Sequence, residues 1–162
     1  MDVHCVEINE IFAYTINEKS LNMINKITTE WKGGMTFKSD NPSGNSFLID
    51  DKVEGVNKRE GLAPKSLMLS ALAGCTGLDV VSVLDKMKVT NYDFKMEVTG
   101  ELTEEHPKYY HKVKLDYHFY GINLNEKKIK KSVDLSVEKY CGVMEMFRQF
   151  AKLDTEIHYH NK

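Results

Sequence analysis

The chain has 162 residues, of which 41% are hydrophobic and 28% charged, and its formal net charge is -2. This composition is typical of one globular domain and excludes disordered, collagen-like and coiled-coil proteins. Charges of both signs are interspersed, so no nucleic-acid or membrane partner is expected. Three widely spaced cysteines, an odd number, do not form a disulfide framework and indicate a reducing, cytoplasmic compartment.

The N-terminal part differs from the rest of the chain. Residues 1–22 hold short apolar patches without a sustained period, so we treat them as an N-terminal extension and residues 23–162 as the folded domain. Residues 24–31 predict a strand that turns at Gly33 and Gly34 into a returning strand at 35–38. Residues 46–50 predict a third strand.

Residues 66–87 are apolar nearly all round and too long for one strand, which predicts a buried helix. Pro64 just before the start and lysines at the end suit a helix. Asp79 in the middle of the stretch makes it a poor membrane span. The remaining segments are too few to cover such a helix on every side. We therefore expect a second subunit to cover it.

Alternating apolar and polar residues predict two long antiparallel strands, which begin near Tyr92 and Tyr109 and are joined by a turn at 104–107. Residues 125–139 predict an amphipathic helix, which Gly142 interrupts, and a short helix and a closing strand follow. Strands and helices do not alternate along the chain as they do in a parallel sheet. The order of elements therefore predicts an α+β fold.

Two cysteines are the candidates for chemistry. Cys75 lies inside the predicted buried helix beside Gly74, Thr76 and Gly77, whose small size leaves room above its sulfur. The simplest interpretation of such a cysteine is a small apolar core residue. Cys141 stands at the helix break, and its separation from Cys75 in the sequence neither supports nor forbids a disulfide.

The histidines do not have the spacing of a metal site. His158 and His160 share one face of the closing strand, whereas His111 and His118 lie on opposite faces of theirs. No metal and no cofactor are expected, because paired Cys–His clusters and phosphate-binding glycine motifs are missing from the sequence.

Five short segments carry a resemblance to a known family. They are Trp31-Lys32-Gly33-Gly34, Ala63-Pro64, Gly74-Cys75-Thr76, Asp79-Val80-Val81 and Glu138-Lys139-Tyr140-Cys141. From Ile24 to the C-terminus the chain resembles the OsmC/Ohr family of thiol-dependent hydroperoxide reductases. The resemblance is closest to the uncharacterised OsmC-like branch that carries Glu-Lys-Tyr-Cys.

The resemblance implies an intertwined homodimer in which long buried central helices are flanked by antiparallel sheets. It also implies that Cys75 is the peroxidatic thiol, which a small-molecule peroxide oxidises to a sulfenic acid. Cys141 would then resolve the sulfenic acid as a disulfide, and a cellular dithiol would reduce that disulfide.

The sequence departs from the family where the peroxidatic cysteine is activated. Met35 stands at the position of the family's arginine, and Lys65 at that of its glutamate. A buried thiol still needs a nearby cation to ionise at neutral pH. The candidates to supply that charge are Arg148, Arg59 and Lys65.

Three functions remain open from the sequence. The first is a cysteine-based peroxidase. The second is a non-catalytic dimer that binds a small apolar ligand in an interface cleft lined by Met68, Leu72, Met144 and Phe147. In the third, both cysteines are purely structural.

Overall fold

The structure, a computed structural model, describes residues 24–51 and 60–161. The chain divides into two units, residues 1–63 and residues 64–162. The expected extension at residues 1–22 and the candidate residue Arg59 lie outside the described residues.

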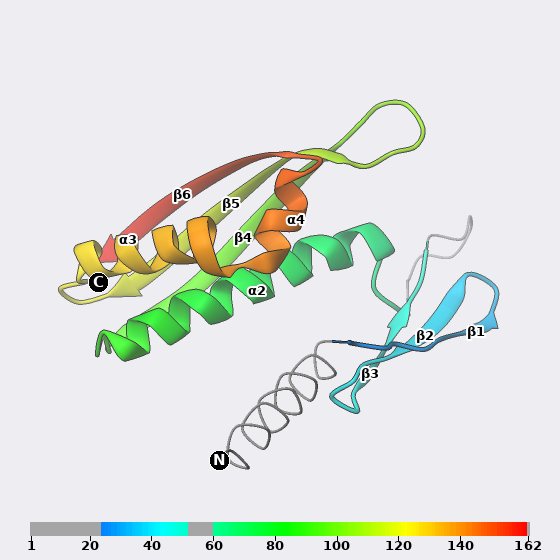
Figure 1. Cartoon of the computed structure of the whole chain (residues 1–162), viewed down its shortest axis with the longest axis horizontal. Helices are drawn as coiled ribbons and strands as arrows, with labels where there is room; N and C mark the ends of the chain where they lie inside the picture. Colours follow the sequence, from blue (N-terminus) through cyan, green and yellow to red (C-terminus); the bar gives the residue numbers. More distant parts are fainter. Residues whose placement is uncertain (1–23, 52–59, 162) are drawn as a thin grey trace, which may run out of the picture. The chain divides into compact units, whose positions relative to one another are not determined.

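The first unit contains a small antiparallel sheet. Its strands follow the chain in the order β1 (Thr29–Gly33), β2 (Thr36–Asp40) and β3 (Ser46–Ile49) (Figure 1). Gly33 and Gly34 turn the chain between β1 and β2 with φ values of +105° and +54°, a region that favours glycine. The predicted hairpin and third strand are confirmed, although β1 begins at Thr29 rather than at residue 24.

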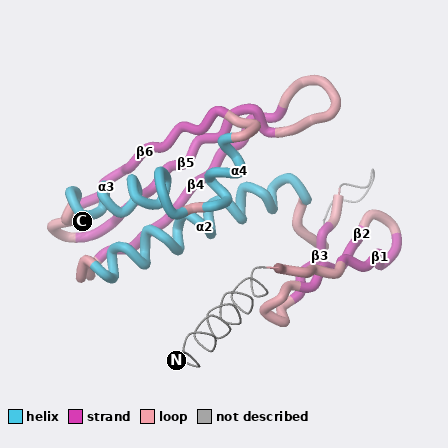
Figure 2. Tube along the Cα trace, viewed as in Figure 1, coloured by secondary structure: helices cyan, strands magenta, loops and turns pink. Residues whose placement is uncertain are grey.

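The second unit places its helices on one side of a three-stranded sheet (Figure 2). Its elements in chain order are α2 (Pro64–Lys86), β4 (Tyr92–Leu102), β5 (Tyr110–Gly121), α3 (Glu126–Leu135), the π-helix η1 (Ser136–Tyr140), α4 (Gly142–Arg148) and β6 (Lys152–Asn161). Each element except η1 corresponds to a predicted one, because a single helix was predicted over 125–139 where α3 is followed by η1. The α+β fold is confirmed.

The sheet of the second unit is mixed rather than wholly antiparallel. Strands β4 and β5 pair antiparallel, as expected, but β6 lies parallel to β5, with Lys112 opposite Lys152 and Gly121 opposite Asn161. The difference arises because α3, η1 and α4 carry the chain back along the sheet before β6 begins. Such a crossover returns the chain in the same direction.

The core lies between the sheet and the helices. Alternate residues of β5 point into it, and they are Val113, Leu115, Tyr117 and Phe119. Helix α2 buries Leu72, Thr76, Val80 and Leu84, which recur at four-residue steps and form one face.

The opposite face of α2 is apolar and open in the single chain. Leu78 is 74% exposed, and Met68 and Val81 are each 43% exposed. A β-carbon added at Gly74 would meet no atom within 4 Å, whereas at Gly77 it would meet the Met96 sulfur at 3.3 Å. The chain therefore covers one face of the predicted buried helix and leaves the other uncovered.

By length and composition alone, α2 is also apolar enough to cross a membrane. In the structure it packs instead against β4, α3 and α4. Asp79, near its middle, accepts a hydrogen bond from Ser136.

We expect Leu115→Ala to destabilise the fold by about 3 kcal/mol, because truncating a fully buried leucine leaves a cavity. Urea denaturation followed by circular dichroism measures this change. Ile122→Ala is the matched control, since Ile122 is 71% exposed and its truncation is expected to cost less than about 0.5 kcal/mol. Equal losses in the two variants would contradict the assigned core.

Candidate functional site

The two candidate cysteines lie together. Cys75 is half-buried on α2, and Cys141 is buried between η1 and α4. Their sulfur atoms and one carboxylate oxygen of Asp79 all lie within 4.8 Å of one another. Residues far apart in the sequence thus form a group of two thiols and one carboxyl.

The π-helix sets the position of Cys141. In η1 the amide of Cys141 donates to the carbonyl of Ser136 at 3.0 Å, one residue further back than in an α-helix. The chain then leaves helical geometry at Cys141, whose φ and ψ are −76° and 101°. Its sulfur accepts a hydrogen bond from the amide of Met144 at 3.3 Å, so Cys141 is the N-cap of α4.

Asp79 is a site residue that the sequence analysis did not identify as functional. It lies four residues after Cys75 on α2, and residues at that spacing share a helix face. The hydroxyl of Ser136 donates to its carboxylate at 3.2 Å. The four-residue spacing of a cysteine and an aspartate in an apolar helix was the signal that could have found it.

A buried chain of hydroxyl groups leads to Asp79. The Thr76 oxygen lies 2.8 Å from the Tyr117 hydroxyl and 2.8 Å from the Ser136 hydroxyl. Ser136 also lies 3.2 Å from the Thr76 carbonyl, which can only accept, as can the Asp79 carboxylate. Ser136 therefore shares its single hydroxyl hydrogen between these two acceptors and accepts from Thr76, and Thr76 accepts from Tyr117.

Burial dominates the electrostatics of the site. It raises the pKa of the Cys141 thiol to about 12, and the hydrogen bond with the Cys75 thiol and the nearby Asp79 act in the same direction. The amide of Met144 opposes this shift without cancelling it. Burial likewise raises the pKa of Tyr117 to about 12, so its phenol is protonated at neutral pH and can donate.

The cationic side chains predicted to help ionise Cys75 are the next candidate residues of the site. The guanidinium of Arg148 pairs with the Glu145 carboxylate at 3.0 Å and also donates to the carbonyl of Val137. Lys65 lies near the start of α2, about 15 Å along the helix axis from Cys75. The structure thus groups Cys75 with Cys141 and Asp79, whereas the contacts of Arg148 are with Glu145 and Val137. Met35 belongs to the other unit.

The apolar cleft expected for the alternative function is not formed as predicted. Leu72, Met144 and Phe147 are core residues with almost no exposed surface, since they pack between the helices and the sheet. Met68 instead lines a separate pocket of about 270 Å³ near the start of α2. The other lining residues are Lys65, Lys108, Tyr109, Tyr110 and Phe150.

Because its pKa is about 12, the Cys141 thiol is expected to remain protonated and unreactive at pH 8. In a Cys5→Ser/Cys75→Ser variant, iodoacetamide should alkylate the folded protein more than about tenfold more slowly than the urea-unfolded chain. Removing Cys75 deletes its hydrogen bond and its charge as causes of the pKa shift of Cys141 but leaves burial, the largest cause. The Cys5→Ser/Cys141→Ser variant, which keeps the half-buried Cys75, is the control.

The same shift makes stability depend on pH. An unfolded cysteine loses its proton near its ordinary pKa of about 8.5, whereas the folded one holds it to about pH 12. The contribution of Cys141 to the free energy of unfolding is therefore complete below that ordinary pKa and is lost as the pH rises toward 12.

In the alkylation experiment, equal rates for the folded and the unfolded chain at pH 8 would contradict the raised pKa of Cys141.

Three comparisons relate the chain to known proteins. Residues 55–156 match the family model described as OsmC-like protein. Protein YhfA of Escherichia coli strain K12 is 32% identical over 120 residues, which cover 74% of this chain and 87% of YhfA.

Solved structures share the fold. A hypothetical protein from Aquifex aeolicus VF5 is 27% identical with a TM-score of 0.75, and the match covers 86% of this chain and 98% of that one. The organic hydroperoxide resistance protein OhrB of Bacillus subtilis is 17% identical with a TM-score of 0.57, and the match covers 84% of this chain and 98% of that one. The chain therefore belongs to the OsmC-like protein family.

Proposed function

We propose that the protein is a thiol-dependent hydroperoxide reductase whose redox pair is Cys75 and Cys141. The observation that carries the proposal is the grouping of both sulfurs and the Asp79 carboxylate within 4.8 Å. Cys75 is the more accessible thiol and is the one that meets the peroxide. Membership of a family that includes organic hydroperoxide resistance proteins supports the same activity.

The first step transfers one oxygen atom. The Cys75 sulfur attacks the outer peroxide oxygen, the O–O bond breaks, and the products are a Cys75 sulfenic acid and an alcohol. The thiol proton must leave the sulfur and reach the departing alkoxide. Asp79 lies next to the sulfur and its carboxylate accepts protons, so it takes the proton from Cys75 and returns it to the alkoxide.

The second step closes the disulfide. The Cys141 sulfur attacks the sulfenic sulfur, the S–O bond breaks, and the Cys141 proton leaves with the hydroxyl as water. Because Cys141 holds its proton strongly, this step too needs a neighbouring base, and Asp79 is placed for it. A cellular dithiol then supplies two electrons and two protons by thiol–disulfide exchange.

As a base, Asp79 helps to ionise the Cys75 thiol, a role that the sequence analysis assigned to a cation. The hydroxyl chain from Tyr117 through Thr76 and Ser136 fixes the carboxylate, because each hydroxyl is buried and hydrogen-bonded. Arg148, Lys65 and Arg59 stay candidates for stabilising the thiolate charge. The same side chains of a second subunit are candidates for this role as well.

We further propose that the protein acts as a homodimer in the cytoplasm. The open apolar face of α2, with Leu78 at its centre, is the surface that a second copy would cover. Thiols that cycle between reduced and oxidised forms need a compartment with a dithiol reductant, and the cytoplasm is such a compartment.

The alternative function, binding of a small apolar ligand, now has a different site. The pocket of about 270 Å³ at Met68 and Phe150 has apolar walls and two lysines among its lining residues. It favours an apolar molecule with a negatively charged end.

We expect the reduced protein to consume cumene hydroperoxide and H2O2 faster than Cys75→Ser does, by more than about 100-fold in stopped-flow experiments. Cys141→Ser is expected to keep the first step and to accumulate a sulfenic acid that dimedone traps. The reference protein and both variants carry Cys5→Ser, so the reference keeps two thiols and each variant keeps one. A wild-type rate equal to that of Cys75→Ser would overturn the peroxidase and leave the ligand-binding alternative.

Asp79→Asn is expected to lower the rate of Cys75 oxidation by about 100-fold, the loss typical of a missing general base. Asp85→Asn is the matched control, because Asp85 is an exposed carboxylate on the same helix. Circular dichroism of both variants reports folding. A folded Asp79→Asn protein with the wild-type rate would contradict the role of Asp79 as the base, but not the role of Cys75 and Cys141 as the redox pair.

Leu78→Asp is expected to convert the protein from a dimer of twice 18.6 kDa into a monomer, because it places a charge on the apolar face. Sedimentation equilibrium measures the mass. Ile122→Asp, at a similarly exposed position in the turn after β5, is the control and should stay dimeric. A monomeric wild-type protein would contradict the dimer.

A further inference from the structure

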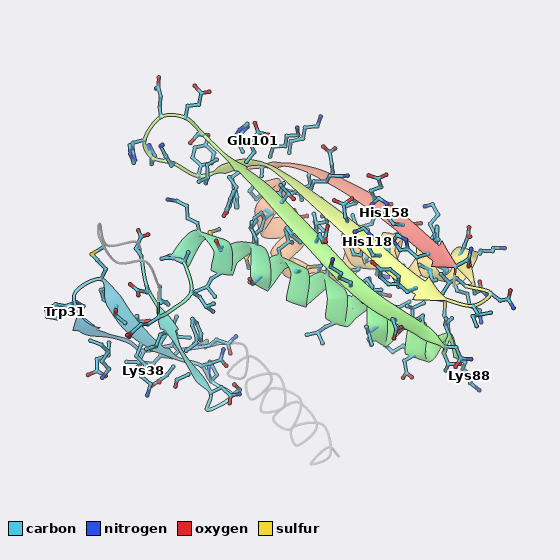
Figure 3. The ribbon with its side chains drawn as sticks, turned by 180° about the vertical axis from the view of Figure 1, so that it is seen from behind. Trp31, Lys38, Lys88, Glu101, His118 and His158 are labelled. Atoms are coloured by element: carbon cyan, nitrogen blue, oxygen red, sulfur yellow. The ribbon has the colours of Figure 1, made fainter. Side chains whose placement is uncertain are left out.

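The outer face of the β4–β5–β6 sheet carries a cluster of imidazole and carboxylate groups. In the parallel register of β5 and β6, Asp116 lies opposite Glu156 and His118 lies opposite His158. Figure 3 shows His118 and His158 next to one another on these two strands. Because side chains alternate along a strand, this face is opposite to the one where Tyr117 meets the hydroxyl chain.

Three of these side chains converge closely enough to hold one ion. The Nε2 atom of His158 lies 2.7 Å from Oδ1 of Asp116 and 3.9 Å from Oε2 of Glu156, and all three atoms lie within 4.8 Å of one another. Ligands that bind one zinc ion at about 2.0–2.2 Å are separated by roughly 3–4 Å. Asp116 is 14% exposed and His158 29%, so the site is partly shielded but open to water.

A cation already lies between the two carboxylates. The ammonium of Lys114 is 2.9 Å from Asp116 Oδ1 and 2.7 Å from Glu156 Oε2. The position therefore favours positive charge. Since the Lys114 side chain is 45% exposed and flexible, it can swing into solvent and release both carboxylates.

The neighbouring imidazoles are incompletely paired. The His118 ring stacks on His158 with centroids 4.5 Å apart, and its Nδ1 lies 3.1 Å from Nε2 of His160. Its Nε2 is buried and has no hydrogen-bond partner among the described residues, although Oε2 of Glu97 lies 3.8 Å away. Buried polar nitrogens are normally paired, so His118 has one unused nitrogen, which lies on the Glu97 side of its ring.

We propose that Asp116, Glu156 and His158 bind a divalent first-row transition metal of the zinc class, with displacement of the Lys114 ammonium. An imidazole nitrogen together with carboxylates suits zinc, manganese or nickel, whereas magnesium and calcium prefer all-oxygen ligands. On binding, the His158 Nε2 proton moves to solvent or to Nδ1, because the metal takes the lone pair. The site does not depend on the redox function.

Isothermal titration of the full chain with Zn²⁺ tests the proposal. The cysteines are replaced by serine, because the pair at Cys75 and Cys141 with Asp79 also offers metal ligands. One ion per chain is expected, and His158→Ala should weaken binding by more than about tenfold. His111→Ala is the matched control, since this exposed histidine lies on the same strand outside the cluster.

Lys114→Met tests the same site through an expected gain, rather than a loss, of Zn²⁺ affinity. Removing the competing ammonium should tighten Zn²⁺ binding several-fold, and a purely structural ion-pair network would not predict that gain. Affinity unchanged by both His158→Ala and Lys114→Met would overturn the proposal, as would equal affinity for Mg²⁺.

Nuclear magnetic resonance of the natural, reduced chain removes dependence on the serine variant. Mn²⁺ is expected to broaden the ring signals of His158 and His118 and to spare those of His111, because relaxation by the ion falls steeply with distance. Broadening of all these histidines alike, or of none, would overturn the proposal. Neither the zinc titrations nor the resonance experiment uses peroxide. A negative result in them therefore overturns the metal site and leaves the proposed reductase untouched.

Discussion

The packing of one face of α2 against the sheet and the other helices is the contact on which the structure depends. Leu72, Val80 and Leu84 bury apolar surface along this face, and Thr76 lies among them. The hydrogen bonds of its hydroxyl to Tyr117 and Ser136 tie the helix to β5 and to η1. Because burial without partners would be costly for these hydroxyls, the polar chain fixes the helix in rotation as well as in depth.

That fixed rotation decides where Cys75 lies. The residue immediately precedes Thr76, so it stands at the boundary between the buried and the open faces of the helix. Asp79, one turn further along, lies beside it. A cysteine in this place has its carboxyl partner and its second thiol on the protein side and an uncovered apolar surface on the other.

Periodicity in the sequence was sufficient to predict most of the fold. The two-residue alternation around Tyr117 identified β5, and the long apolar run identified α2. The direction of β6 was not accessible in the same way, because its alternation is equally compatible with parallel and antiparallel pairing. The π-helix was missed for a related reason: residues 125–139 have the pattern of one continuous helix, and the wide turn at Ser136 becomes visible only with backbone coordinates.

The site was only partly predictable. Cys75 and Cys141 were paired through resemblance to a family, since their separation along the chain carries no information about distance in space. Asp79 was identified in the sequence as a charge that disfavours a membrane span and as part of the family resemblance, but not as a functional residue. The histidine cluster could not be found from spacing, because its members come from two strands whose pairing depends on the crossover.

The parallel pairing of β6 with β5 also determines the order in which the fold can be completed. The antiparallel pair β4–β5 closes over a short turn, whereas β6 reaches β5 only through the long connection that holds α3, η1 and α4. Strand β6 leaves the ribosome after these three helices. Until β6 pairs, one edge of β5 has unpaired amide and carbonyl groups, so the nascent protein is exposed to mispairing of this edge with another strand.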